Sequence, residues 1–349
     1  MRILQVCPGY FPAIGGVQQH VSNISERLAR EHQVTVFATD PSGKLPKEEE
    51  ISGVLVRRFK SFSPNNAYHI SLQMRLELRR SEFDIVHGHS YHALPLCFSR
   101  YAKRSKFIVT AHYHGHGHTL VRDFLLNLYK QFGRKVFQEA DKIIAVSNFE
   151  KSLLIEDFQI PEAKIEVIPN GIACHEFTSL KKEDKGYKTI LYTGRLEGYK
   201  GVQHVVRVLP LLAESTCLQI VGQGPYKKKL SKLATELGVG NRIEFYQDLP
   251  REELLHRYAN ADLFIMPSKH EAFSIAVAEA LAAKTPCIVA NTSALKEWVD
   301  NENCFGIDYP IDIRKLAELI DKVMGKKVGE VRLWDWEEVV AELVKIYEA

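Results

Sequence analysis

The sequence contains few cysteines, and they are not grouped. Six occur among 349 residues, each alone in the chain: Cys7, Cys97, Cys174, Cys217, Cys287 and Cys304. No Cys-x-x-Cys pair is present, so the sequence offers neither a zinc ribbon nor a disulfide framework. Most of the cysteines stand in apolar runs, which predicts buried free thiols in a reducing compartment.

Long hydrophobic runs are missing as well. No stretch approaches the roughly 18 apolar residues that suggest a membrane-spanning helix. The first apolar run stops at Pro8 and Gly9, too early for a signal peptide. These absences predict a cytoplasmic protein, attached at most to the cytoplasmic face of a membrane.

Charge of one sign is not in large excess. Lysine and arginine number 46 against 43 aspartates and glutamates, which gives a formal net charge of +3. We therefore expect no nucleic-acid partner. Basic residues do concentrate between Arg57 and Lys106. That cluster fits either an ordinary solvated surface or a face that attracts an anionic substrate or a membrane.

Short β-branched runs alternate with longer amphipathic segments, the pattern of βαβ units around parallel sheets. Residues 175–188 are polar and charged, which is typical of a linker. We expect two α/β domains, residues 1–174 and 189–330, with ligands bound at strand ends in a cleft between them. Helical spacing at residues 334–347 predicts a last helix, in which Trp334 and Trp336 cannot share a face.

The individual elements follow from these patterns. Strands are expected at residues 3–7, 34–38, 54–59, 85–87, 107–110, 143–146 and 165–168, then at 189–193, 217–221, 243–246, 263–266 and 287–289. Helices are expected at residues 17–31, 72–80, 120–139 and 148–158, then at 202–212, 225–237, 251–259, 275–283 and 313–323.

Glycine-rich phosphate loops are only weakly represented. Gly15-Gly16 follows the first strand and opens the first helix, where backbone N–H groups can approach a phosphate. A tight connection would have the same sequence. No Gly-x-Gly-x-x-Gly occurs, since the segment from Gly222 to Gly224 lacks the third glycine. Dinucleotide-dependent oxidoreductases therefore lose their main sequence support.

The loop after the strand at 189–193 carries two basic residues. Arg195 and Lys200 stand between Gly194 and Gly201. An arginine fork and a lysine charge at the carboxyl end of a strand can clamp a diphosphate, although surface loops often hold such residues without binding anything.

Two glutamates follow the strand at 263–266. Glu271 lies in a short loop, and a helix begins near Ser274, where backbone amides can face an anion. Glu279 comes eight residues after Glu271, so the two carboxylates can bind separate hydroxyl groups of one extended ligand. A solvent-facing glutamate on a helix surface is the plain alternative. It is disfavoured because Glu279 stands in an apolar helix, where an unpaired carboxylate is costly.

The ordered set of motifs resembles the retaining glycosyltransferases of family 4, which adopt the GT-B fold of two facing Rossmann-like domains. The set comprises Gly15-Gly16, TAHYHG around His112, VSNF from Val146, IPNGI from Ile168, GRLEGYKG from Gly194, VGQGP from Val221 and the Glu271-x7-Glu279 pair. The resemblance runs almost end to end. It implies a nucleotide diphosphate sugar donor of UDP or GDP type, a hydroxyl acceptor that is a sugar or is lipid-linked, and a last helix within residues 331–349 that crosses back to the first domain.

The resemblance also assigns roles. Arg195 and Lys200 would hold the diphosphate, Glu271 would contact donor-sugar hydroxyls, and Glu279 would bond the ribose. His112 would lie over the reacting sugar, which makes His112, Arg195, Lys200 and Glu271 the expected catalytic group. The implied donor-binding residues are Gly15, Gly16, Asn170, Gly171, Gly194, Arg195, Lys200, Gly222, Glu271, Ala272, Phe273, Ser274 and Glu279. No Asp-x-Asp is present, and no metal or other cofactor is expected.

Several positions depart from the family's pattern. Ala272 and Ser274 stand where the family commonly has glycines, and Ser293-Ala294 falls where a Gly-Gly often follows the next strand. These extra atoms leave the donor sugar open. Because a fold does not fix a reaction, a nucleotide-sugar epimerase or hydrolase and a non-catalytic nucleotide-sugar binder remain alternatives.

Histidines alternate in one segment. In an extended strand they would share a face and suit a metal ion, whereas Gly115 and Gly117 favour a polar loop on the acceptor side. The alternating residues are His112, His114, His116 and His118, with His87, His89 and His92 nearby in the sequence.

Overall fold

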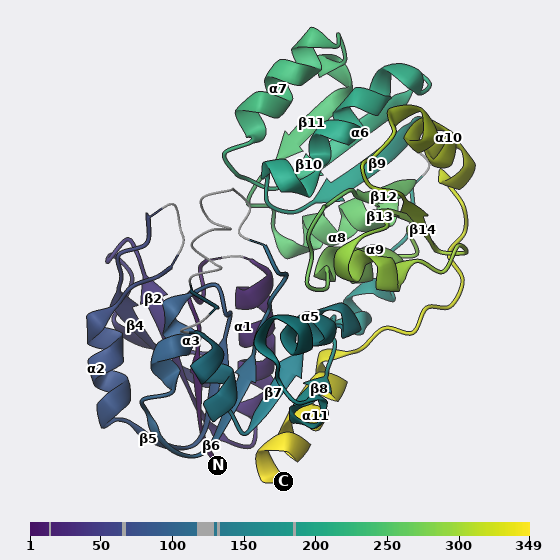
Figure 1. Ribbon diagram of the computed structural model, residues 1–349. Helices are drawn as coiled ribbons and strands as arrows, with labels where there is room; N and C mark the ends of the chain where they lie inside the picture. The colour runs from purple at the N-terminus through teal and green to yellow at the C-terminus, as the bar shows by residue number, and fades with distance from the viewer. Residues whose placement is uncertain (14, 65–67, 117–128, 131–132, 184–185) are drawn as a thin grey trace. The chain divides into compact units, whose positions relative to one another are not determined.

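The computed structural model describes the chain apart from residue 14 and residues 65–67, 117–128, 131–132 and 184–185. The described residues form two compact units. The first unit joins Met1–Gly171 with Trp334–Ala349, and the second is Ile172–Leu333. Their elements are labelled in Figure 1.

The first unit is built on an eight-stranded sheet in the order β3-β4-β2-β1-β5-β6-β7-β8. Neighbouring strands are parallel, except that β3 runs antiparallel to β4. All seven predicted strands are present, and β3 was missed because its sequence, EEEI, is polar. The strands are β1 (Arg2–Val6), β2 (Gln33–Asp40), β3 (Glu48–Ile51), β4 (Val54–Lys60), β5 (Glu82–His89), β6 (Lys103–Thr110), β7 (Lys142–Ala145) and β8 (Ile165–Val167).

The helices of this unit are α1 (Gly16–Leu28), α2 (Leu72–Arg80), α3 (Leu94–Ser99), α5 (Asn148–Phe158) and α11 (Trp336–Glu348). The bounds of α2 and α5 match their predictions. The six-residue helix α3 was missed, because so short a segment leaves no periodic pattern. Much of the predicted helix at 120–139 lies outside the described residues; within it, residues 129–130 and 133–139 are helical.

The last helix belongs to the first unit, as expected. Its start is fixed by a capping box between Asp335 and Glu338. The helical spacing predicts a packed stripe of Val339, Val340, Leu343 and Ile346. The buried stripe consists of Trp336, Val339, Leu343 and Tyr347, whereas Val340 and Ile346 are only half-buried.

The second unit holds a six-stranded, wholly parallel sheet in the order β11-β10-β9-β12-β13-β14. The strand β14 was not predicted. The strands are β9 (Lys188–Thr193), β10 (Thr216–Val221), β11 (Ile243–Tyr246), β12 (Leu263–Met266), β13 (Cys287–Ala290) and β14 (Cys304–Ile307). The helices are α6 (Val202–Val208), α7 (Lys227–Glu236), α8 (Arg251–Asn260), α9 (Ile275–Ala282) and α10 (Ile313–Val323).

Both sheets have the doubly wound order of Rossmann-like folds. The chain reverses its winding direction between β1 and β5 in the first unit, and between β9 and β12 in the second. Ligands of such sheets bind at the carboxyl ends of the strands beside this reversal. Each unit therefore has one predictable place for a site. Among the described residues, no helix has both the length and the apolar character needed to cross a bilayer.

Candidate functional site

A buried ion pair joins two predicted residues in the second unit. Lys200 lies in the 3-10 turn Gly198–Lys200 after β9, and Glu271 lies in the loop after β12. Lys200 Nζ donates to Glu271 Oε1 at 2.5 Å, and the two side chains are only 14% and 13% exposed. Burial alone would lower the pKa of Lys200, but the Glu271 carboxylate outweighs it and raises the pKa. Lys200 therefore keeps its positive charge in this buried position.

Backbone contacts hold these two loops together. Gly201 has a φ of 77°, and a Cβ at this position would lie 2.1 Å from the carbonyl oxygen of Pro267. The N–H of Lys269 donates to the carbonyl of Tyr199 at 2.8 Å. The Lys200–Glu271 pair is thus fixed by the main chain on both sides, and only glycine fits at position 201.

Arg195 makes a different contact from the one that a clamp requires. Its side chain is 61% exposed, and Nη2 lies 3.3 Å from Glu197 Oε1. Gly222 has a packing reason to be glycine, since a Cβ there would lie 1.9 Å from the carbonyl oxygen of Gly194. Gly194 has a φ of 147°, and a Cβ there would lie 3.0 Å from the Tyr192 hydroxyl. Of the two basic residues expected at the diphosphate, Lys200 is buried against Glu271 and Arg195 is exposed to solvent.

The start of α9 is held from the neighbouring 3-10 helix, Ser293–Trp298. Glu271 N–H donates to Ser293 Oγ at 3.1 Å, and Trp298 Nε1 donates to the carbonyl of Phe273 at 2.9 Å. Ser274, the N-cap, has a φ of 87° and makes no side-chain cap hydrogen bond. This helix start can therefore present backbone N–H groups to an anion beside the residues Ala272, Phe273 and Ser274.

Glu279 is buried but not unpaired. Its side chain is 6% exposed, and Oε1 accepts from Arg251 Nη1 at 2.6 Å. Arg251 also donates to Glu176 Oε2 at 2.6 Å. From the sequence alone, a purely structural role for Glu279 is disfavoured, because an unpaired carboxylate is costly in an apolar helix. The ion pair with Arg251 removes that cost, so burial alone does not indicate a binding role. No sequence pattern indicated this partner, because it lies on α8, 28 residues before Glu279.

In the first unit, neither backbone angle nor packing explains Gly16. Gly15, the N-cap of α1, has an extended φ of 173° that any residue can adopt. A Cβ on Gly16 would meet no described atom within 4 Å. This open space in front of the helix start leaves room for a ligand to contact Gly16.

Three histidines meet at the strand ends of the first unit. His20 comes from α1, His89 ends β5, and His112 follows β6 with a φ of 47°. One nitrogen of each lies within 4.8 Å of the others. Burial lowers the pKa of His20 to about 4, against the hydrogen bond to Asn170, and lowers the pKa values of His89 and His112 well below the ordinary range. All three rings are therefore neutral at pH 7.

Amide oxygens orient two of these rings. His20 Nδ1 donates to Asn170 Oδ1 at 2.7 Å, and His89 Nε2 donates to Gln5 Oε1 at 2.7 Å. Gly171, beside Asn170, packs on α11, and a Cβ there would lie 2.7 Å from the backbone nitrogen of Trp336. Asn170 and Gly171, expected at the donor, thus have defined structural contacts in the first unit.

The alternating histidines do not share a face. His112 joins His20 and His89, whereas His114 stacks on His92 with ring centroids 4.3 Å apart and His116 is exposed. His118 lies outside the described residues. The positive φ values of His112 and Gly115 break the extended conformation on which the shared face depended.

Glu150, which the sequence did not single out, anchors the His112 segment. Its two carboxylate oxygens accept the backbone N–H groups of Tyr113 and Val146. Burial raises the pKa of Glu150 to about 8, although these two hydrogen bonds act in the opposite direction.

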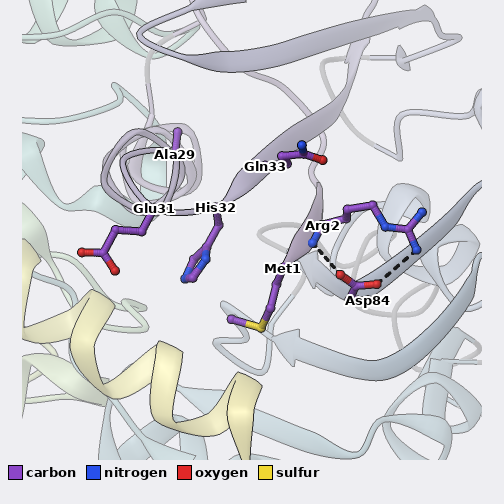
Figure 2. A pocket seen from close by; sticks show the side chains of 7 residues that line it. All are labelled: Met1, Arg2, Ala29, Glu31, His32, Gln33 and Asp84. Atoms are coloured by element: carbon purple, nitrogen blue, oxygen red, sulfur yellow. Dashed lines mark hydrogen bonds and ion pairs between the residues drawn. The ribbon is translucent and has the colours of Figure 1, made fainter.

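Figure 2 shows a surface hollow elsewhere in the first unit, lined by Met1, Arg2, Ala29, Glu31, His32, Gln33 and Asp84. Arg2 and Asp84 form an ion pair across one side of it. The hollow lies at the amino ends of β1 and β2, opposite the strand ends where ligands of this fold bind. We do not assign the site to it.

Two doubly wound units with these strand-end clusters define the GT-B class of nucleotide-sugar enzymes. The sequence profile of Glycosyltransferase Family 4 matches residues 14–176, and that of Glycosyl transferases group 1 matches residues 176–332. The chain belongs to glycosyltransferase family 4, and it is an enzyme that transfers a sugar from a nucleotide-sugar donor.

Known proteins align over most of the chain. A glycogen synthase of Mycobacterium tuberculosis is 28% identical, with 100% of this chain and 95% of that protein covered. The GDP-mannose-dependent alpha-(1-6)-phosphatidylinositol monomannoside mannosyltransferase of Mycolicibacterium smegmatis is 26% identical, with coverages of 85% and 82%. Anabaena HepE, solved in complex with UDP-glucose, has a TM-score of 0.80 at 15% identity, with coverages of 100% and 99%, which shows a shared fold.

Proposed function

We propose that this enzyme transfers a sugar, with retention of configuration and without a metal, from a UDP- or GDP-type diphosphate sugar to a hydroxyl acceptor. The observation that carries the proposal is the buried Lys200–Glu271 pair at the switch point of the second unit. A fixed cation here offsets the charge that develops on a departing diphosphate, and such preorganised charges are a large term in catalysis.

Different groups around this pair bind different parts of the donor. Lys200 and the N–H groups at the start of α9 face the diphosphate, and Arg195, free to swing in from solvent, adds a second cation. Glu271 accepts hydrogen bonds from hydroxyl groups of the donor sugar, and Glu279 accepts hydrogen bonds from the ribose hydroxyls. The hydroxyl of Ser274 and the methyl of Ala272 would narrow the space around the sugar.

His112 contributes from the first unit. A neutral imidazole can accept a hydrogen bond from a sugar hydroxyl or donate one to it. It does so without placing a second cation near the anomeric centre. We assign no protein base, because the leaving phosphate itself can take the acceptor's proton. Gly16 lies against the phosphate or sugar.

A donor screen tests this function. Purified protein is melted with UDP-, GDP-, ADP- and CMP-sugars, since a ligand of the folded state raises the melting temperature. We expect one diphosphate class to raise it, and diphosphate release from that donor to accelerate when a panel of sugar and lipid-linked acceptors is added. Equal release without acceptor indicates a hydrolase, conversion of the sugar an epimerase, and binding without turnover across the panel a non-catalytic binder.

We further propose that the acceptor is lipid-linked and that α2 rests on the membrane. Leu72 and Leu76 are 68% and 54% exposed on one face of this helix, and Arg79 and Arg80 are exposed beside them. Phe62, before the helix, is 70% exposed. Apolar side chains flanked by arginines suit an anionic bilayer surface, and the mannosyltransferase relative is named for a phosphatidylinositol-based acceptor.

Vesicle co-sedimentation tests the membrane contact. We expect salt-sensitive binding to phosphatidylglycerol vesicles and none to phosphatidylcholine vesicles. A Leu72→Glu/Leu76→Glu/Arg80→Glu variant should lose this binding, and Leu211→Glu, which alters a similarly exposed leucine of the second unit, should keep it. Arg75 and Arg79 are left unchanged because their guanidinium groups lie 5.1 Å and 5.0 Å over the Tyr101 ring. Absence of wild-type binding at low salt would favour a soluble acceptor.

A further inference from the structure

We propose that His20, His89 and His112 form a binding site for one Zn²⁺-class transition-metal ion, separate from any requirement of the transfer reaction. Neutral imidazole is a preferred ligand of zinc, copper, nickel and cobalt ions. The three rings come from α1, β5 and the segment after β6, so the site exists only in the folded unit.

The spacing of the rings fits one ion. Their centroids are 4.9 Å apart for His20 and His112, 5.5 Å for His20 and His89, and 6.0 Å for His89 and His112. Three imidazoles at zinc bond lengths in tetrahedral geometry have centroids about 5 Å apart and nitrogens about 3.3 Å apart. The observed nitrogens lie within 4.8 Å of one another, so binding needs ring shifts of about 1 Å.

Hydrogen bonding selects the nitrogens that face the ion. His20 donates through Nδ1 to Asn170, and His89 donates through Nε2 to Gln5, so the lone pairs stand on His20 Nε2 and His89 Nδ1. Within the described part of the chain, these two atoms and His112 Nε2 are buried and have no hydrogen-bond partner. Two buried acceptors without donors, and a third buried ring nitrogen without a partner, are costly unless a ligand satisfies them.

The outer contacts are those of a metal site. Ligating histidines usually donate their second nitrogen to an oxygen, which fixes the tautomer. Gln5 extends this chain, because its Nε2 donates to Tyr347 Oη, which lies 2.7 Å from His87 Nδ1. His112 holds its position on a strained backbone, with a φ of 47°. Three protein ligands leave a fourth position open.

The consequence for catalysis rests on the proposed function. That function places His112 against a sugar hydroxyl, and an ion on His112 Nε2 occupies the same nitrogen. Zinc should therefore inhibit transfer, and a chelator should reverse the inhibition. Metal binding itself is measured without donor or acceptor, so it can fail or succeed independently of the transferase assignment.

Cobalt substitution tests the site directly. Chelator-treated, dialysed protein is titrated with Co²⁺, which absorbs visible light when bound in tetrahedral geometry. We expect saturation at one ion per chain and displacement by Zn²⁺. His20→Asn and His89→Gln keep a polar atom at the nitrogen that bonds Asn170 or Gln5 but remove the ligand atom, so both should abolish the signal.

Controls separate binding from folding. His256→Gln removes an exposed histidine and should leave the titration unchanged. Asn170→Ala should weaken cobalt affinity about 10–100-fold, since it removes only the outer contact. Circular dichroism and melting confirm that each variant folds. A folded wild-type protein without the cobalt signal, or a signal that survives both His20→Asn and His89→Gln, would overturn the proposal.

Discussion

The two units share a doubly wound topology but differ in the chemistry at their strand ends. In the second unit the switch point is lined by charges: Lys200 with Glu271, and Arg251 with Glu279. In the first unit it is lined by neutral histidines, His20, His89 and His112. One topology therefore carries a cluster of charged side chains in one unit and a cluster of uncharged polar side chains in the other.

The difference lies in how each half satisfies buried polar groups. Charges in the second unit are paired with one another, so a donor must exchange contacts with an existing ion pair. In the first unit amides orient the imidazoles of His20 and His89, each of which keeps one ring nitrogen without a hydrogen-bond partner among the described residues. The first arrangement suits a diphosphate, and the second suits hydroxyl groups or a metal ion.

The largest expected effect comes from Lys200→Ala. The proposed function has Lys200 offset the charge on the departing diphosphate, so its loss should lower kcat/KM about 100- to 1,000-fold. Because Glu271 is only 13% exposed, the variant should also lose about 2–3 kcal/mol of unfolding free energy, somewhat less than for a fully buried pair. Steady-state transfer and urea unfolding measure the two effects, with exposed Lys228→Ala as control.

A double variant separates these two effects. Lys200→Met with Glu271→Gln removes both charges together and should restore much of the stability but none of the transfer. If this double variant recovered transfer, the Lys200–Glu271 ion pair would not be needed for catalysis.

Glu150→Ala should have the largest effect on stability in the first unit. It leaves the buried N–H groups of Tyr113 and Val146 without their acceptor, which should lower the unfolding free energy by about 2–4 kcal/mol. Glu156→Ala on the same helix removes an exposed carboxylate and should be near neutral. Equal stability of the two variants would mean that Glu150 does not anchor the His112 segment.

Glu150 also predicts a pH dependence. Because its folded pKa is raised to about 8, the folded state holds a proton that the unfolded state releases near pH 4.5. Its contribution to stability is therefore present at low pH and is lost as pH rises through about 8. Urea unfolding between pH 5 and pH 9 should show a fall in wild type that Glu150→Ala lacks. A profile unchanged by Glu150→Ala would assign the fall to other groups.

A smaller effect is expected at Ser274. Its φ of 87° is unfavourable for serine, so Ser274→Gly should stabilise the second unit by about 0.5–1 kcal/mol. Ser231→Gly, within α7, should instead destabilise by about 0.5 kcal/mol. Thermal melts of the two variants test the sign, and a loss of stability in Ser274→Gly would show that the serine side chain makes a stabilising contact.

The smallest expected effect is that of a chelator. In the proposed function Lys200 and the start of α9 take the place of a cation at the diphosphate. Excess EDTA should therefore leave donor binding and transfer unchanged, or raise transfer slightly by removing inhibitory zinc. Loss of transfer that magnesium or manganese restores would contradict this.

Local sequence patterns predicted most of the secondary structure. The bounds of α2, α5, α10, β11 and β12 match their predictions, because apolar periodicity and N-cap residues such as Ser147 and Asp312 act over a few neighbouring residues. The missed elements β3, β14 and α3 are short, and β3 is also polar, so they leave little pattern.

The sequence does not show which glycines are required by packing and which are not. Gly171, Gly201 and Gly222 are required by backbone atoms from distant segments, whereas Gly16 faces open space among the described residues. Conversely, Ser274 and Ser293 keep positive φ values of 87° and 50° at positions where the family commonly has glycine. The backbone course is thus retained although the residue type has changed.

The sequence by itself determined the two α/β units, the strand-end loops that carry Lys200, Glu271 and His112, and the family, because each depends on residue type and local order. Only the tertiary structure decided which side chains contact one another. Arg251 reaches Glu279 across 28 positions, and His20 meets His89 and His112 from three elements. Such contacts arise where parallel strands end side by side, and their free energy depends on burial and mutual distance, neither of which a local pattern encodes.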